Sequence, residues 1–200
     1  VTFDQKPVCT KGAQVGDHVF VTKGVALEGT AILANDFSHV ARNFGISLAE
    51  MDEASEVLKE VSIIPEALVL AKHGATSMHD VTRGGLMETL LEMAQLSEVG
   101  IRAELAEVPI PAIVKRFSSA FKFDPLKMIS SGTLVATVPP EQVKAAGDEL
   151  SSLGILFSDI GEVFEGKGVQ IYNQGQISTS VGIHCEEDEL ARMWELYSHD

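Results

Sequence analysis

The chain has 200 residues with 45% hydrophobic content, which is enough for one globular domain with a buried core. Fifteen lysines and arginines against 29 aspartates and glutamates give a formal net charge of −14, which excludes nucleic acid and anionic membranes as general partners. No apolar run approaches the ~18 residues that a membrane-spanning helix needs. The two cysteines, Cys9 and Cys185, lie far apart and form no Cys-x-x-Cys spacing, which favours a reduced, cytoplasmic protein.

The first half of the chain alternates between strand and helix patterns that are separated by glycine and proline. Ser47, followed three residues later by Glu50, has the spacing of a capping box that begins a helix. Pro65 suits a first helical turn, and Gly74 follows the end of that helix. The expected elements are strand His18–Thr22, helix Leu27–Phe44, helix Leu48–Val61, helix Pro65–Lys72, strand Ala75–His79 and helix Leu86–Leu96.

The second half continues this alternation and ends in hairpin patterns with glycine-rich turns. The expected elements are strand Gly100–Leu105, helix Pro111–Phe121, strand Thr133–Val138, helix Glu141–Leu153, strands Ile155–Phe164, Val169–Tyr172 and Ile177–Val181, and helix Glu187–Tyr197. This order predicts a single α+β domain over residues 1–200. We expect a layered, mixed sheet covered by the helices Leu27–Phe44, Leu86–Leu96 and Glu141–Leu153.

The stretch richest in chemical groups runs from His79 to Leu86, between a strand pattern and a helix pattern. A glycine turn at such a junction directs free backbone N–H groups and the positive helix end towards an anion. Arg83 adds a guanidinium that suits phosphate or carboxylate, and Asp80 either holds Arg83 or Thr82 in place or contacts the substrate. The pattern is also typical of a plain tight turn before a capped helix. The predicted phosphate- or substrate-binding residues are Asp80, Thr82, Arg83, Gly84 and Gly85.

Two further binding candidates lie at other junctions between strands and helices or turns. Glu28 follows a glycine at the start of a helix pattern, where it suits a substrate amine or hydroxyl, a cation, or simply the helix dipole. Ser131 precedes an apolar strand and either offers a hydroxyl and an N–H group to a ligand or forms a plain turn.

The sequence predicts no metal site and leaves the catalytic residues unassigned. The six histidines have no His-Glu-x-x-His or other metal-ligand spacing. The chain contains no nucleophile elbow, Walker A loop or dinucleotide-binding loop. His18 lies inside a strand pattern and is expected to be structural, whereas His79 lies among chemically useful neighbours.

Three stretches, taken in order, resemble one family. They are Gly16-Asp17 with Gly24 to Thr30; His79 to Leu86; and Asp124-Pro125-Leu126 with Gly132 to Ala136 and Ile160 to Val163. Together they resemble the C-terminal domain of the aminoimidazole ribonucleotide (AIR) synthetase, or PurM, superfamily. This superfamily includes selenophosphate synthetase, thiamine-monophosphate kinase, formylglycinamidine synthase and the hydrogenase maturation factor HypE. The middle and third stretches are most similar to HypE.

The resemblance implies a PurM C-terminal domain-like fold and ATP-dependent activation of an oxygen, with ATP and Mg²⁺ as cofactors of the intact protein. In HypE-like members the acceptor is a thiocarboxamide on a C-terminal cysteine, and its dehydration yields the cyanide ligand of nickel–iron hydrogenase. Phosphorylation turns a poor leaving oxygen into a good one, and placed cations and N–H donors stabilise the developing charge. The resemblance therefore implies dehydration of a carbonyl or thiocarboxamide oxygen.

The chain departs from this family in two respects. Family members carry an N-terminal ATP-binding domain with the acidic metal ligands, and we expect this domain to be absent here because the matching motifs begin near Val15. We accordingly expect the chain alone to be inactive and to bind neither ATP nor Mg²⁺. HypE ends in a proline-arginine-isoleucine-cysteine tail, whereas this chain ends in Tyr197-Ser198-His199-Asp200. The acceptor therefore stays open.

The resemblance also implies partners. These are the N-terminal domain of the same polypeptide, a second copy in a homodimer, and hydrogenase maturation proteins. Three alternatives remain beside the ATP-dependent enzyme half. One is a binding or assembly module without chemistry of its own, and another is a stand-alone ligand-binding domain that reuses the fold. The third is a domain of another ATP-dependent member, such as a selenophosphate synthetase or a thiamine-monophosphate kinase.

Overall fold

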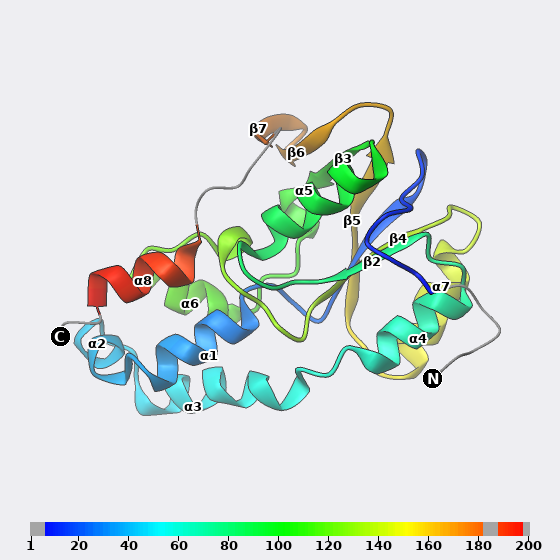
Figure 1. Ribbon diagram of the computed structural model, residues 1–200. Helices are drawn as coiled ribbons and strands as arrows, with labels where there is room; N and C mark the ends of the chain where they lie inside the picture. The colour runs from blue at the N-terminus through cyan, green and yellow to red at the C-terminus, as the bar shows by residue number, and fades with distance from the viewer. Residues whose placement is uncertain (1–6, 182–187, 198–200) are drawn as a thin grey trace.

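The computed structural model describes residues 7–181 and 188–197, and its centre is a seven-stranded mixed sheet (Figure 1). The strand order is β2-β4-β1-β5-β3-β6-β7. Only β3 and β6 pair in parallel among the strands described, and the other neighbours are antiparallel. The strands are β1 (His18–Thr22), β2 (Ser77–Asp80), β3 (Gly100–Glu104), β4 (Leu134–Val138), β5 (Phe157–Phe164), β6 (Gly168–Asn173) and β7 (Gln176–Val181). The prediction of a mixed sheet in an α+β fold is confirmed.

Eight α-helices accompany the sheet within the described residues. They are α1 (Leu27–Asn35), α2 (Ser38–Asn43), α3 (Leu48–Glu56), α4 (Ile64–Lys72), α5 (Gly85–Ser97), α6 (Ala112–Phe121), α7 (Val143–Ser152) and α8 (Glu189–Tyr197). Short 3₁₀ turns follow α3 (Val57–Glu60), follow β3 (Leu105–Glu107), and precede β4 (Pro125–Lys127). None of the helices in the described part of the chain is long and apolar enough to cross a membrane.

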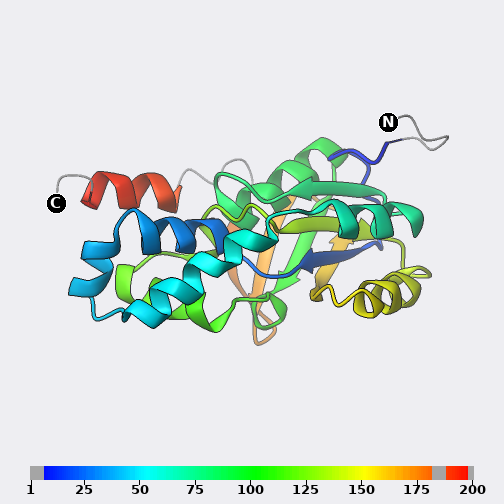
Figure 2. The same cartoon turned by 90° about the horizontal axis from the view of Figure 1, so that it is seen from below.

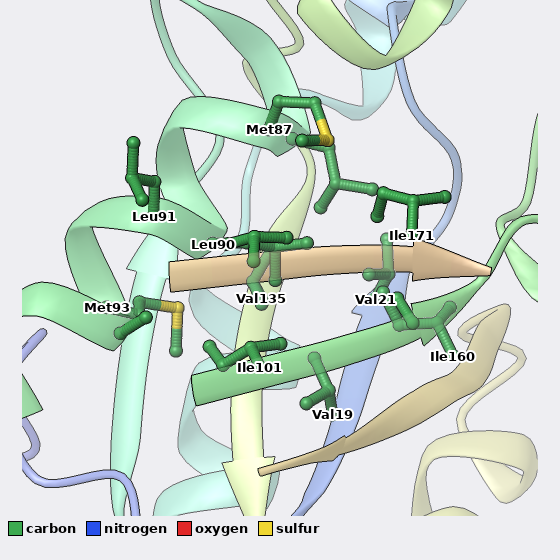
Figure 3. Packing of buried hydrophobic residues seen from close by; sticks show 14 of the residues in the cluster. Val19, Val21, Met87, Leu90, Leu91, Met93, Ile101, Val135, Ile160 and Ile171 are labelled. Carbon is green, nitrogen blue, oxygen red and sulfur yellow. The ribbon is translucent and has the colours of Figure 1, made fainter. Parts of the chain in front are cut away.

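The alternation of side chains along the strands places different helices on the two faces of the sheet. Val19 and Val21 of β1 point to α5, whose Leu90 is fully buried against the sheet (Figure 3). Phe20, between them, packs with α4 and α7 on the opposite face. The sheet is therefore a central layer, with α5 on one side and the α4–α7 pair on the other at the β2-β4-β1 end.

The remaining helices form a separate cluster beside the sheet, which we call the helical lobe: α1, α2, α3, α6 and α8 (Figures 1 and 2). Its core is aromatic. Phe37 contacts Trp194 of α8 at a ring-centroid distance of 4.7 Å, and Phe121 contacts Tyr197 at 5.7 Å. The buried residues of this lobe come from helices and loops rather than from strands. The prediction that the segment Leu27–Phe44 covers the sheet is therefore wrong.

The same segment was expected as one helix, and the structure divides it into α1 and α2. The interruption falls at Phe37, whose φ of −111° and ψ of 29° are not helical. The break lets the chain turn and buries the Phe37 ring in the helical lobe, a tertiary contact that outweighs the local helical pattern. The capping box at Ser47 and Glu50 is confirmed, with both reciprocal hydrogen bonds present.

Other boundaries shift by a few residues from those predicted. The helix expected from Glu141 begins at Val143, because Gln142 N–H donates to Pro139 O in a turn before it. The strand expected over Ala75–His79 is Ser77–Asp80, so Asp80 lies in a strand rather than in the turn. The predicted start of the last helix at Glu187, and Cys185, lie outside the described residues.

Candidate functional site

The connection between β1 and α1 has an unusual backbone. Lys23 and Ala26 both adopt left-handed conformations, with φ of 59° and 60°, although neither is glycine. Ala26 is the N-cap of α1. The connection is held in place by a hydrogen bond from Val25 N–H to Pro109 O of 3.0 Å. Non-glycine residues in this region cost free energy and cluster at functional sites.

Two buried hydroxyl groups fix this connection from the other side. The backbone N–H of Leu27 donates to Ser130 Oγ at 3.0 Å, and Ser130 Oγ lies 2.7 Å from Thr133 Oγ1. The Thr133 hydroxyl in turn donates to the carbonyl of Gly24. Sequence reasoning selected the neighbouring Ser131 as the binding residue and gave neither Ser130 nor Thr133 this structural role. The available signal was a pair of hydroxyl residues directly before a buried strand.

Glu28 and Ser131, predicted separately from stretches 103 residues apart, are in direct contact. The backbone N–H of Ser131 donates to Glu28 Oε2 at 3.2 Å. On the next residue, Gly29 N–H donates to Ile129 O at 3.1 Å. A side chain on Gly29 would overlap the side chain of Met128. The first turn of α1 therefore lies directly against the loop that leads to β4.

The glycine turn lies at the start of α5, as predicted. It also packs against the same loop. Gly84 is the N-cap with a φ of 79°, and Gly85 has a φ of 67°. A Cβ atom on Gly85 would lie 2.6 Å from Leu126 O and 2.8 Å from Met128 N, both backbone atoms. The loop of residues 124–133, which we call the bridging loop, thus contacts the N-termini of both α1 and α5.

The charged side chains beside the glycine turn form ion pairs with His79 and with the start of α8. Arg83 is 88% exposed, and its Nε lies 3.7 Å from Asp188 Oδ2 at the start of α8. Asp80 instead lies beside His79, with 3.4 Å between Asp80 Oδ1 and His79 Nδ1. His79 Nε2 also contacts Glu92 at 2.8 Å. The ion pairs of the structure therefore do not bear out the alternative in which Asp80 holds Arg83.

This arrangement can bind an anion through the backbone. The N–H groups of the first helical turn have no partner inside their own helix, and the helix dipole adds positive potential there. In α5 one of them is used locally, because Gly85 N–H donates to Thr82 O at 3.1 Å. Thr82 and Arg83 are both exposed beside this turn, whereas Gly84 and Gly85 are buried, and the missing side chain of Gly85 lets the bridging loop pack directly against it.

Over residues 7–181 and 188–197, no group of three or more His, Cys, Asp or Glu side chains is placed to hold a metal. Glu28 contacts the bridging loop, where one of its oxygens accepts from the backbone N–H of Ser131. A cavity of about 460 Å³ adjoins this region and is lined by Lys23, Leu27, Glu56, Val57 and the segment Gly154–Leu156.

Three features together define the class of this domain: the mixed sheet, the glycine turn at the start of α5, and the bridging loop that contacts the N-termini of α1 and α5. The sequence profile of the AIR synthase related protein, C-terminal domain, matches residues 14–173. The chain belongs to this family.

The curated proteins that are similar to this chain include carbamoyl dehydratases HypE and hydrogenase expression/formation proteins. Carbamoyl dehydratase HypE of Bradyrhizobium diazoefficiens is 31% identical over 155 residues, which cover 75% of this chain and 42% of that protein. A putative hydrogenase expression/formation protein of Methanocaldococcus jannaschii is 30% identical over 135 residues, covering 66% of this chain and 36% of that protein. The chain thus spans less than half the length of these relatives.

Solved structures share the fold. HypE of E. coli has a TM-score of 0.75 at 22% identity, over 94% of this chain and 55% of that chain. Thiamine-monophosphate kinase of Stenotrophomonas maltophilia has a TM-score of 0.68 at 21% identity, over 86% of this chain and 54% of that chain. A HypE in complex with ATP has a TM-score of 0.66 at 20% identity, over 92% of this chain and 55% of that chain.

Proposed function

We propose that this chain is the C-terminal domain of a HypE-like protein that uses ATP to activate a carbonyl or thiocarboxamide oxygen for dehydration during hydrogenase maturation. The observation that supports this most is the convergence of the three family-like stretches. The bridging loop contacts Glu28 through Ser131 and packs against Gly85 through Met128. An extended phosphate-bearing ligand needs donors from several segments at one place, and this loop brings them together.

In this proposal the backbone at the start of α5 binds a phosphoryl oxygen. Gly84 and Gly85 form the tight left-handed turn from which the helix begins, and the exposed Arg83 donates from the side. ATP, when bound, supplies the phosphoryl group that makes the substrate oxygen a good leaving group. Glu28, oriented by Ser131 N–H, is positioned to accept a proton or hydrogen bond from the substrate nitrogen that loses its protons during dehydration.

Binding requires Arg83 to leave Asp188. The two side chains are 3.7 Å apart and the arginine is largely exposed, so their attraction is worth at most about 1 kcal/mol. A doubly charged phosphate competes readily with such a pair. We propose that the Mg²⁺ ligands come from an N-terminal domain, in keeping with a relative of which this chain covers only 42%.

The partners in this proposal follow from the relatives. A HypE–HypF complex has been solved, and its HypE-like fold matches this chain with a TM-score of 0.68. We propose cytoplasmic hydrogenase maturation proteins and a second copy of the chain as partners. The likeness to thiamine-monophosphate kinase supports a second candidate function, in which the same site transfers a phosphoryl group to a phosphate acceptor. Retained nucleotide binding without turnover on either acceptor would instead favour an assembly module.

The test is Arg83→Ala in a polypeptide that joins this chain to its N-terminal domain. ATP affinity, measured by titration calorimetry, should fall by about 1.5–3 kcal/mol, the contribution of one charged hydrogen bond. The melting temperature should stay unchanged because the side chain is 88% exposed. Arg42→Ala, an exposed arginine of the helical lobe, is the matched control and should leave affinity unaltered. Unaltered affinity with a lowered melting temperature in Arg83→Ala would show that Arg83 is structural.

A further inference from the structure

The helices α4 and α7 cover only part of their face of the sheet. The rest of that face carries polar side chains. α4 and α7 pack over β4, β1 and the start of β5. Farther along the same face, β3 presents Arg102 and Glu104, and β6 presents Tyr172. The alternate residues Ile101 and Ile171 are buried under α5 on the opposite face (Figure 3). The polar residues therefore follow the period of the strands and share one surface.

This surface is hollowed into a cavity of about 630 Å³, which we call the open-face pocket. The hollow lies where the pairing of β1 with β5 shifts register between Val19 and Phe20. Beside this shift, β5 approaches β3 so closely that a Cβ on Gly161 would lie 2.8 Å from Ala103 Cα. The lining residues are His18, Arg102, Ala103, Glu104, Glu107, Asp159, Ile160, Gly161, Glu162, Tyr172 and Gly175.

Two charged pairs stand in the pocket wall, and the wall has an excess of carboxylates. His18 Nδ1 lies 2.6 Å from Asp159 Oδ2, and Arg102 Nε donates to Glu162 Oε1 at 2.6 Å. Both pairs are partly exposed to solvent. With Glu104 and Glu107, the lining has four carboxylates and a single guanidinium. The potential inside the pocket is therefore negative.

The hydrogen-bonding groups of the wall are mainly acceptors. The Asp159 carboxylate lies against His18 Nδ1 and orients the imidazole ring in the wall. Tyr172 donates its hydroxyl hydrogen to Gln170 Oε1 at 3.2 Å, so its oxygen can accept. Much of the lining surface is apolar, although the side chains of Ala103 and Ile160 belong to the core on the α5 side. A complementary ligand carries several N–H donors and positive charge on a short apolar frame.

We propose that the open-face pocket binds a small organic cation of the alkylamine or guanidine class. The cavity volume falls within the range of about 300–1,000 Å³ typical of small-molecule sites. Its negative potential opposes phosphate, so it differs chemically from the glycine turn. The two sites also lie towards opposite ends of β1, because His18 begins that strand and the connection after Thr22 leads to α1. The inference does not depend on the proposed ATP-dependent function.

The test uses the 200-residue chain and agmatine, a butylamine that carries a guanidine group. Titration calorimetry at about 0.15 M salt, where long-range attraction to an acidic protein is screened, should show one saturable site at millimolar or lower ligand. Asp159→Asn should weaken binding roughly tenfold, because it removes a carboxylate charge from the pocket wall. Glu107→Gln, at an exposed position, should weaken it several-fold.

The controls separate a built site from general attraction to a protein of charge −14. Glu141→Gln makes the same change of charge at an exposed position outside the pocket and should leave affinity unaltered. Butane-1,4-diol, which has a similar length and no charge, should not bind. No saturable agmatine binding, several weak sites, or an equal loss in Glu141→Gln would each overturn the proposal. Binding of an oligolysine peptide without agmatine binding would overturn it in favour of a protein partner.

Discussion

Replacing Gly85 by alanine tests the contact between the glycine turn and the bridging loop. Gly85 is buried and has a φ of 67°, a conformation that is costly for any residue with a side chain. The new Cβ would lie 2.6 Å from Leu126 O, 2.7 Å from Lys127 C and 2.8 Å from Met128 N. All three are backbone atoms, so the overlap cannot be relieved by a side-chain rotation.

The expected loss of stability has two parts. The left-handed backbone costs about 1–2 kcal/mol once a Cβ is present. Overpacking against the bridging loop adds about 1–3 kcal/mol. Together they lower the free energy of unfolding by roughly 2–5 kcal/mol. Gly74→Ala is the matched control, because Gly74 has a φ of 72° and nothing lies within 4 Å of its added Cβ. This control should lose only the first part.

Urea denaturation of the two variants and the wild type measures both quantities. The difference between Gly85→Ala and Gly74→Ala isolates the overlap with the loop. Equal destabilisation of the two variants would refute the argument, because it would mean that the bridging loop moves away from Gly85 at no cost. In a polypeptide that also contains the N-terminal domain, Gly85→Ala should additionally weaken ATP binding, whereas Gly74→Ala should not.

Three further predictions concern acid stability, a buried ion pair and turnover. Hydrogen bonds from the backbone and side chain of Ser47, and then from Arg116, lower the pKa of Glu50 from 4.5 to about 2. The stability that this carboxylate contributes is present above pH 4.5 and is lost as the pH falls towards 2. The melting temperature of Glu50→Gln should therefore decline less steeply than that of the wild type over this pH range. An unchanged slope would contradict this expectation. In the wild type, Lys23 Nζ lies 2.9 Å from Oε1 of the buried Glu66. Lys23→Met removes this ion pair and should lower the free energy of unfolding, measured by urea denaturation, by about 3 kcal/mol. The 200-residue chain alone should hydrolyse little or no ATP in a phosphate-release assay, and robust Mg²⁺-dependent turnover would show that no further domain is needed.

Features that depend on neighbouring residues were predictable from the sequence. The capping box at Ser47 and the glycine turn at the start of α5 are both confirmed, because each depends on hydrogen bonds or backbone angles within a few residues. The strand expected over His18–Thr22 is β1, and the helix expected over Leu86–Leu96 is α5, which covers one face of the sheet. The resemblance of three ordered stretches to the AIR synthase related family is likewise confirmed by the match over residues 14–173.

The arrangement of the site depended on contacts between distant segments. Sequence reasoning selected Glu28 and Ser131, but nothing local showed that the N–H of one donates to the carboxylate of the other. It left the partner of Asp80 open, and the fold placed His79 there and Asp188 beside Arg83.

The same distinction explains the helix that the fold divides at Phe37. Local propensity is a sum of small terms from adjacent residues, and it predicted a continuous helix over Leu27–Phe44. Burying an aromatic ring against α8, which lies more than 150 residues later, contributes more than those terms. The turns and caps could be predicted from the order of the residues, because they arise from short-range sterics and hydrogen bonds. Which helix ends meet at the bridging loop depends on how the whole chain packs, and no local pattern contains that information.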